Sequence, residues 1–119
     1  MMHAACVLCG RVGRVERHHP TRRAGRGGEY LDGGFVVFVC AGCHAQIHQA
    51  LRVVGLDWPG AGAEPLAYRL RVTAAHVELL GAQGSAFPIA PESAPAFAAL
   101  LRAAASAIDV ASSARARTA

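Results

Sequence analysis

The sequence predicts a small α+β fold, and three observations support it. Residues 35–39 are β-branched or aromatic, which is typical of a strand. Residues 41–52 place apolar and histidine side chains at helical spacing, and the alanine-rich second half of the chain repeats that spacing. With 119 residues and seven aromatic side chains (one Trp, two Tyr and four Phe), the chain is expected to form one domain with a thin core.

The first strand is expected over residues 11–19, after a tight turn between two cysteines. Val12 and Val15 are its apolar positions. Pro20 ends it, because proline cannot donate a hydrogen bond to a ladder. A loop rich in Arg and Gly then covers residues 21–33 and leads to the second strand.

A helix follows the second strand, which occupies residues 35–39. It is expected to cover residues 41–52, and four of its side chains share one face at i, i+3, i+4 and i+7 spacing. These four residues are His44, Ile47, His48 and Leu51.

Two further helical segments are predicted in the second half of the chain. The first has the apolar stripe Leu66, Leu70, Thr73, Val77 and Leu80, although the alternation at residues 68–72 would also suit a strand. The second begins near residues 91–93 and has the stripe Phe97, Leu100, Leu101, Ala104 and Ile108.

These elements divide the chain into three parts. Residues 1–52 form the core that carries the chemistry, because all four cysteines and five of the six histidines lie there. Residues 53–108 are a connector, rich in Gly and Pro up to residue 64, and a helical extension packed on the core. Residues 109–119, which are small residues and Arg, are predicted to be a disordered tail.

The basic residues are all arginine, twelve in number, and the net charge is +4. Six of them fall within residues 11–26. A solvated loop can be arginine-rich without a function. Guanidinium groups also match phosphate oxygens, so the cluster alternatively indicates a surface that binds nucleic acid.

The sequence predicts no membrane span and a cytoplasmic location. No segment reaches about eighteen consecutive apolar residues. The first nine residues lack the charged start and the apolar run of a signal peptide. In the cytoplasm, paired cysteines are more often metal ligands than disulfides.

Four cysteines form two pairs of the type Cys-x2-Cys, Cys6 with Cys9 and Cys40 with Cys43. Two such pairs suit tetrahedral zinc, because each pair supplies two thiolates. A redox dithiol and unpaired buried cysteines are the alternatives. A structural zinc ion would supply much of the folding free energy of so thin a core.

The same spacing is expected to bring four histidines together. His18 and His19 end the first strand, and His44 and His48 lie on the helix that begins at the second cysteine pair. A zinc ion tying the two pairs together would draw that strand end toward the helix. Neighbouring residues on a strand point to opposite sides, so His18 and His19 are not expected to bind the same ion.

The order of these motifs resembles the zinc-ribbon branch of the HNH endonucleases. The resemblance covers residues 6–48 and rests on Cys6-x2-Cys9-Gly10, on Glu16-Arg17-His18-His19-Pro20, and on Cys40-x2-Cys43-His44-x2-Ile47-His48. It implies a ββα-metal core that hydrolyses phosphodiester bonds in DNA, or alternatively RNA. The second half of the chain resembles no family that we can name.

The resemblance also implies residue roles. The four cysteines would hold the structural zinc. His18 and His44 would bind a catalytic divalent cation such as Mg²⁺ or Mn²⁺, with His48 as a further ligand or phosphate contact. His19 would be the general base. Separately from the resemblance, the clustering of arginines predicts nucleic-acid contacts at Arg17, Arg22, Arg23 and Arg26.

The chain departs from the HNH pattern in one respect, because it contains no Asn. Asp32 is the nearest polar candidate for that place. It could accept the other N–H of the base, or it could simply be a turn residue. Glu16 could likewise support the metal ligands or be a solvated strand residue.

The sequence is therefore compatible with three functions. The first is a metal-dependent DNA endonuclease. The second is a non-catalytic zinc-ribbon module that binds nucleic acid, which the missing Asn favours. The third is a protein-interaction adaptor that uses the alanine-rich helices.

Overall fold

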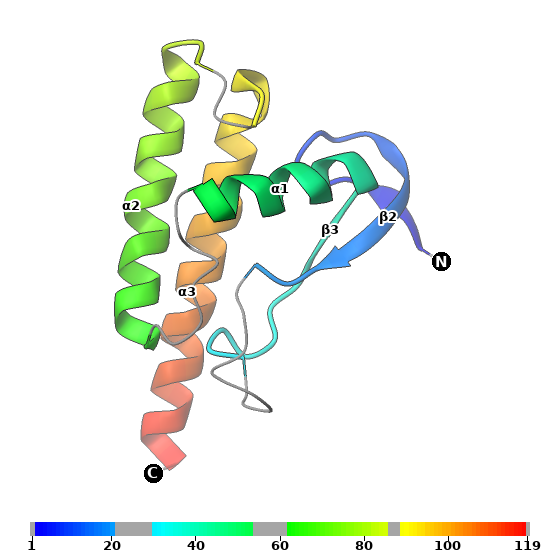
Figure 1. Ribbon diagram of the computed structural model, residues 1–119. Coiled ribbons are helices and arrows are strands. Elements are labelled where there is room, and N and C mark those ends of the chain that lie inside the picture. Colours follow the sequence, from blue (N-terminus) through cyan, green and yellow to red (C-terminus); the bar gives the residue numbers. More distant parts are fainter. Residues whose placement is uncertain (1, 21–29, 54–61, 86–88, 119) are drawn as a thin grey trace.

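The computed structural model describes residues 2–20, 30–53, 62–85 and 89–118, and its fold is α+β (Figure 1). The class predicted from the sequence is therefore confirmed. A small antiparallel sheet and one helix make up the N-terminal half, and two long helices make up the rest. In chain order the elements are β1 (Met2–Ala5), β2 (Val12–His18), β3 (Val37–Val39), α1 (Ala41–Val53), α2 (Ala63–Ala82), a 3-10 turn (Pro91–Ser93) and α3 (Ala94–Thr118).

The sheet has the strand order β1-β2-β3, with both neighbouring pairs antiparallel. In the second pair, Glu16 lies opposite Val39 and His18 lies opposite Val37. β1 was not predicted, because its sequence, Met-His-Ala-Ala, has weak strand propensity. It forms because the cysteine turn folds the chain back, and the N–H of Val7 also donates to the carbonyl of Phe38 at 3.0 Å.

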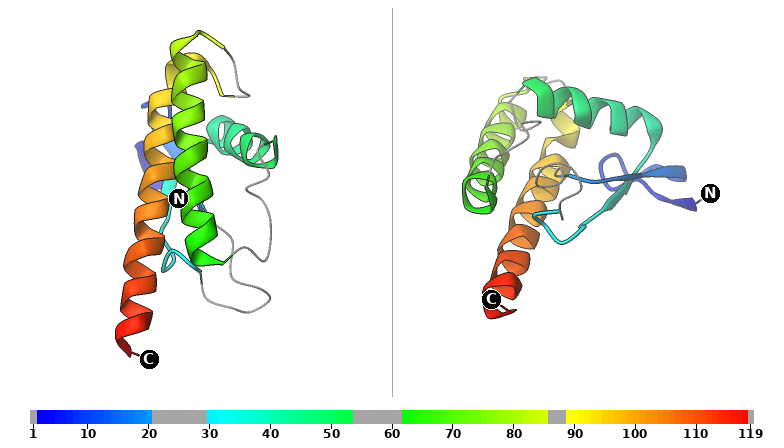
Figure 2. Two further views of the ribbon diagram at one scale, coloured as in Figure 1. Left: turned by 90° about the vertical axis from the view of Figure 1, so that its left-hand side faces the viewer. Right: turned by 60° about the horizontal axis from the view of Figure 1, so that its bottom comes forward.

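Helix α1 is separated from β3 by Cys40 alone and reaches from the sheet to the two long helices (Figure 2). Its side chains Ile47, Ala50 and Leu51 are buried in the core. Its extent agrees with the helix predicted at residues 41–52. Because one face of α1 is fixed by this burial, the neighbouring positions at His44 and His48 are held beside the end of β2.

Helices α2 and α3 pack side by side as an antiparallel pair (Figures 1 and 2). The strand alternative for residues 68–72 is therefore wrong. The helices approach closely at Gly81, where a Cβ atom would overlap the Cβ of Ala94. Across the pair, Arg71 contacts Asp109 at 2.6 Å and Arg102 forms an ion pair with Glu78.

The second long helix continues to Thr118, beyond residue 108, where we expected a disordered tail to begin. The extension packs beside the turn that precedes β3. Arg115 donates to the carbonyl of Leu31 at 3.2 Å, and Ala111 lies against Gly33. These tertiary contacts, with the alanine and arginine residues that favour a helix, explain why the segment is ordered.

One buried core runs through both halves of the molecule. It extends from Cys6 and Leu8 in the cysteine turn, through Ile47 of α1, to Leu70 and Phe97 in the long helices. The two long helices therefore share one core with the N-terminal part. The middle of the predicted connector, residues 54–61, and most of the arginine-rich loop, residues 21–29, lie outside the described residues.

Among the described residues, one helical segment, Pro91–Arg117, is long and apolar enough to cross a membrane by length and composition alone. The core helix of a soluble protein passes the same test. Of the most apolar part of this segment, 44% is buried inside the protein, where it packs on α2.

Candidate metal centres

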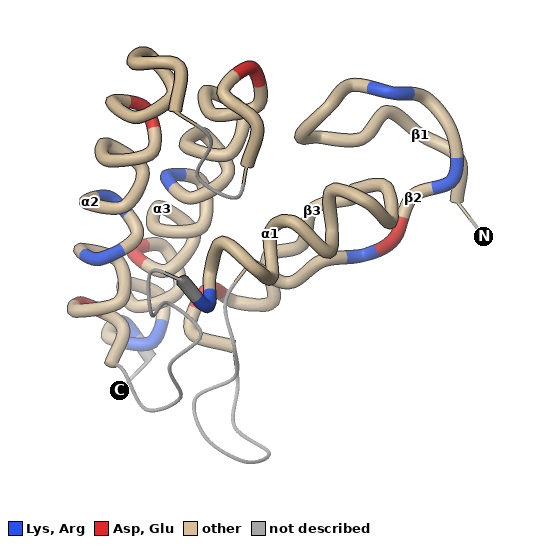
Figure 3. The backbone as a smooth tube through the Cα atoms, turned by 45° about the horizontal axis from the view of Figure 1, so that its top comes forward, with Lys and Arg blue, Asp and Glu red and all other residues tan. Residues whose placement is uncertain are grey.

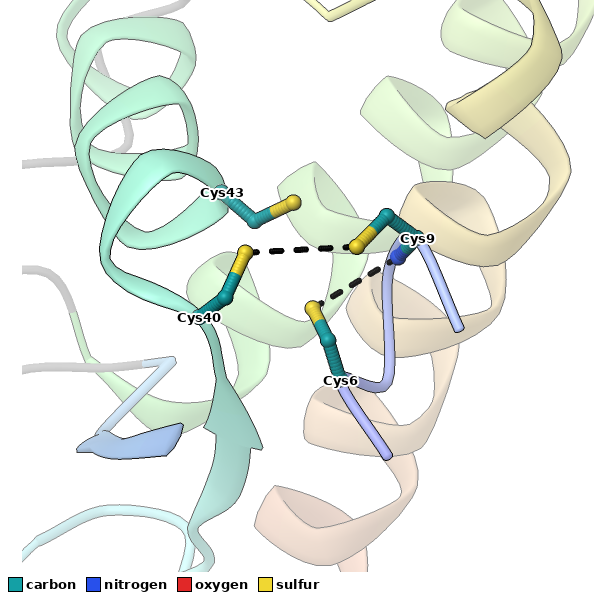
Figure 4. A group of neighbouring side chains, drawn as sticks. All are labelled: Cys6, Cys9, Cys40 and Cys43. Carbon is teal, nitrogen blue, oxygen red and sulfur yellow. Dashed lines mark hydrogen bonds between the residues drawn. The ribbon is translucent and has the colours of Figure 1, made fainter. Parts of the chain in front are cut away.

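The four cysteines converge between the β1–β2 turn and the start of α1 (Figure 4). Their Sγ atoms all lie within 4.8 Å of one another, and none is in a disulfide. The Sγ atoms of Cys9 and Cys40 are 3.9 Å apart. Four thiolates around one zinc ion, each at about 2.3 Å, are roughly 3.8 Å from each other. The cluster therefore has the dimensions of a structural zinc site.

Backbone hydrogen bonds hold the turn from Cys6 to Gly10 without help from a metal ion. The N–H of Gly10 donates to the carbonyl of Cys6 at 2.9 Å, and the N–H of Cys9 points at the Sγ of Cys6 at 3.5 Å. Gly10 has a φ of +78°, a conformation that side chains disfavour, so glycine is the natural residue there. On the other side, the first turn of α1 positions Cys43 relative to Cys40.

The electrostatics of the cluster also suit a cation. Burial raises the pKa of the Cys6 thiol, but N–H groups of Cys9, Cys40 and Leu8 outweigh that effect and lower the pKa to about 6. Burial, followed by contacts with the other three thiols, raises the pKa of Cys43. Four thiolates would therefore repel one another unless a positive ion lay between them. These residues could hold a structural metal such as zinc.

A second cluster consists of His18, His44 and His48. One ring nitrogen from each lies within 4.8 Å of the others. His18 ends β2, and the other two are one turn apart on α1. The ring centroid of His18 is 5.1 Å from that of each partner, with edge-to-face geometry. The structure thus brings together the three histidines expected to bind a divalent cation.

His18 is 1% exposed, yet neither of its ring nitrogens has a hydrogen-bond partner among the described residues. Burying an unpaired polar group costs about 1–3 kcal/mol. Burial, together with the nearby His44, His48 and His19, lowers the pKa of His18 to about 4. A neutral imidazole with an unused lone pair is the form that binds a metal ion, so these three residues fit a cation.

Glu16 sets the orientation of His44. Its Oε1 lies 3.0 Å from His44 Nδ1. An ionised carboxylate can only accept, so Nδ1 must donate, and the lone pair of the neutral ring is left on Nε2. That Nε2 lies 3.0 Å from the Nε2 of His48. The arrangement matches the carboxylate–histidine pairs that orient ligands in metal sites.

His19 lies outside this cluster. Its ring stacks on Tyr30, with centroids 4.5 Å apart and an interplanar angle of 6°. It is half-buried, and its Nδ1 is buried without a hydrogen-bond partner among the described residues. The stacking fixes the plane of the ring. The sequence alone does not indicate Tyr30, because its contact with His19 depends on the tertiary fold.

Asp32 belongs to the turn before β3. It is 4% exposed, and its Oδ1 accepts a hydrogen bond from the N–H of Gly34 at 3.0 Å. Nδ1 of His19 has no hydrogen-bond partner among the described residues, so Asp32 does not accept a bond from that nitrogen. Asp32 also lines a hollow of about 440 Å³ between this turn and α3. The contact with Gly34 is typical of a turn residue.

The expected nucleic-acid contacts are described only in part. Arg17 is exposed on β2, and basic positions also occur on the long helices (Figure 3). Successive strand residues face opposite sides, so Arg17 points away from the side that carries Glu16 and His18. Arg22, Arg23 and Arg26 lie outside the described residues.

Comparison with known proteins adds no relative. No protein-family model, curated protein or solved structure matches the chain.

Proposed function

We propose that this protein is a metal-dependent endonuclease of the HNH type that hydrolyses phosphodiester bonds in DNA. The observation that carries the proposal is the cluster of three imidazoles in which buried His18 has no hydrogen-bond partner for either ring nitrogen among the described residues. A structural zinc site does not need this cluster, because the four cysteines already form a complete donor set. Plain binding of nucleic acid does not need it either.

In this proposal the histidines share one divalent cation. His18, His44 and His48 hold it, and Glu16 keeps the lone pair of His44 directed toward it. When bound, such an ion neutralises charge on the scissile phosphate and on the leaving oxygen. Three protein ligands leave space beside the ion for substrate.

His19 serves as the general base in this account. A neutral imidazole has one nitrogen with a free lone pair, so it can take a proton from the attacking water. The histidine cluster consists of His18, His44 and His48, which leaves His19 outside it. Stacking on Tyr30 holds the His19 ring in one plane. The ring therefore loses less conformational freedom when it reaches the reactive geometry.

A non-catalytic zinc-ribbon module that binds nucleic acid is the second candidate. Two observations favour it: the chain has no Asn, and the carboxylate of Asp32 is used in a turn. Such a module would bind DNA through arginine side chains, and its affinity would fall steeply with salt. It would not cut DNA with any metal ion.

Plasmid nicking separates the two candidates. The zinc-loaded protein is assayed with Mg²⁺, Mn²⁺, Co²⁺, Ni²⁺ and Zn²⁺, beside His19→Ala and a matched His3→Ala variant. His3 is exposed on β1, outside the histidine cluster, so its replacement should leave nicking unchanged. We expect His19→Ala to lose about a hundredfold or more in rate. If the parent cuts with none of these ions, the binding module replaces the nuclease.

A further inference from the structure

Helix α2 carries an apolar stripe that does not face the core. The α2 stripe consists of Pro65, Tyr68, Val72, Ala75, Leu79 and Ala82, all of which are exposed. Its three largest members, Tyr68, Val72 and Leu79, are 69%, 50% and 56% exposed. Single exposed apolar residues are common on protein surfaces, but a continuous row of them marks an interaction site.

The spacing of the α2 stripe alternates between three and four residues along the whole helix. That is the spacing of a coiled-coil seam, in which every member meets a partner helix. The buried side of α2, which packs on α3, is a separate set: Leu66, Ala67, Leu70, Ala74 and Val77. Helix α2 is therefore apolar on two sides, and α3 covers only one of them.

We propose that α2 pairs in antiparallel fashion with α2 of a second copy of this chain. In that register Tyr68 meets Leu79 of the second copy, Val72 meets Ala75, and Pro65 meets Ala82. Each of the six members of the α2 stripe then packs against a member of the α2 stripe of the second copy. The two α2–α3 pairs together form a four-helix arrangement.

On one edge of the stripe, the charged residues are complementary in this register. Arg71 and Glu78 directly precede Val72 and Leu79, so they flank the same edge. The antiparallel pairing brings Arg71 of each copy beside Glu78 of the other. Both side chains are 45% exposed, although each already pairs within its own chain, with Asp109 and Arg102 respectively. The contacts between copies would extend these two ion pairs.

A parallel pairing fits less well. It would place each member of the α2 stripe against the same residue of the second copy. A wide layer of two Tyr68 side chains would then lie two layers away from a narrow layer of two Ala75 side chains. Helices cannot pack evenly over layers of such different width. Antiparallel pairing also aligns opposite ends of the helix dipoles.

The test is sedimentation of the zinc-loaded full chain from about 1 to about 100 μM. We expect reversible dimers in the parent protein. Leu79→Glu places a charge in the seam and should weaken association about tenfold or more. Val110→Glu is the matched control, because Val110 is 68% exposed on α3 outside the stripe, and it should dimerise like the parent. A parent that is monomeric throughout, or a Leu79→Glu variant that dimerises equally well, overturns the proposal.

Mixing two variants tests the orientation. Tyr68→Arg should also weaken dimers, which gives a second variant should Leu79→Glu fail to fold. In an antiparallel pair, a mixture of the two variants forms one Arg–Glu layer and one layer with the original Tyr–Leu contact. Association should therefore recover in the mixture. If the mixture dimerises no better than either variant alone, the antiparallel register is excluded.

Discussion

The carboxylate of Glu16 and the imidazole of His44 meet at 3.0 Å, across the gap between β2 and α1. The contact joins the strand that ends at His18 to the helix that carries His44 and His48. Because a carboxylate only accepts, it also selects one tautomer of His44. The side chain of Glu16 is 52% exposed, so solvent screens its charge, and orientation is its main contribution.

Replacing Glu16 should weaken binding of a divalent cation to the histidine cluster. We expect Glu16→Ala to lose about 10- to 100-fold in affinity, because outer carboxylates orient metal ligands. Glu16→Gln keeps an accepting oxygen and should lose less. The measurement is metal titration by calorimetry, with the His44 tautomer followed by nitrogen NMR. Glu64→Ala, at an exposed position in α2, is the control. Equal affinity in Glu16→Ala and the control would contradict this role.

The cysteine cluster should bind one zinc ion per chain and stabilise the N-terminal half. Elemental analysis should find about one tightly held zinc. Cys6→Ser removes a buried ligand and should lower the melting temperature by ~10 °C or more, since zinc binding couples to folding. Strong chelation should have the same effect. Unchanged melting after complete zinc removal would exclude a structural metal.

Two glycine substitutions should change stability in opposite directions. Gly81→Ala forces a methyl group against Ala94 and should destabilise the protein by about 1–3 kcal/mol, despite the higher helix propensity of alanine. At Gly42 in α1, an added Cβ meets nothing within 4 Å. Gly42→Ala should therefore stabilise by up to about 1 kcal/mol. Urea unfolding measures both. A neutral or stabilising Gly81→Ala would contradict the close approach of α2 to α3.

Acid should destabilise the protein through His18 when the histidine cluster holds no cation. The pKa of His18 falls from 6.5 to about 4 in the folded state, so below 6.5 the unfolded chain binds a proton that the folded chain does not. The contribution of His18 to the free energy of unfolding is complete above pH 6.5 and is lost as the pH falls toward 4. Between about pH 7 and about pH 5.5 the parent should lose about 1 kcal/mol more than His18→Leu.

Urea unfolding at both pH values, at equal zinc content, gives that difference. Comparison with His18→Leu removes the acid sensitivity of the cysteine cluster, which both proteins share. The same loss in parent and variant would show that His18 is not the responsible group.

Local spacing in the sequence predicted most of what positions the two clusters. The pairs Cys6–Cys9 and Cys40–Cys43 and the interval from His44 to His48 fix geometry within one turn each. The position of Glu16 was also foreseeable, since residues 16 and 18 of a strand share a face. The contact of Glu16 with His44 was not predicted, because it depends on how α1 packs on β2.

Features that depend on distant contacts were missed. Tyr30 and His19 stack only after the fold brings them together. The end of α3 was predicted to be disordered because it consists mostly of small residues and Arg. In the structure, Arg115 and Ala111 dock on the turn before β3. β1 has weak propensity and forms through pairing with β2. In each case tertiary contacts outweigh local preference.

The proposed mechanism assigns cation binding to one set of residues and proton transfer to another residue. The most direct measurement is a titration of DNA nicking with divalent cation for the parent, His18→Ala and His19→Ala, with metal binding measured on the same preparations. We expect His18→Ala to require at least about tenfold more metal. His19→Ala should bind metal like the parent and nick about a hundredfold or more slowly at saturation. Nicking by His19→Ala at the rate of the parent, or a metal requirement that His18→Ala does not change, would contradict the account.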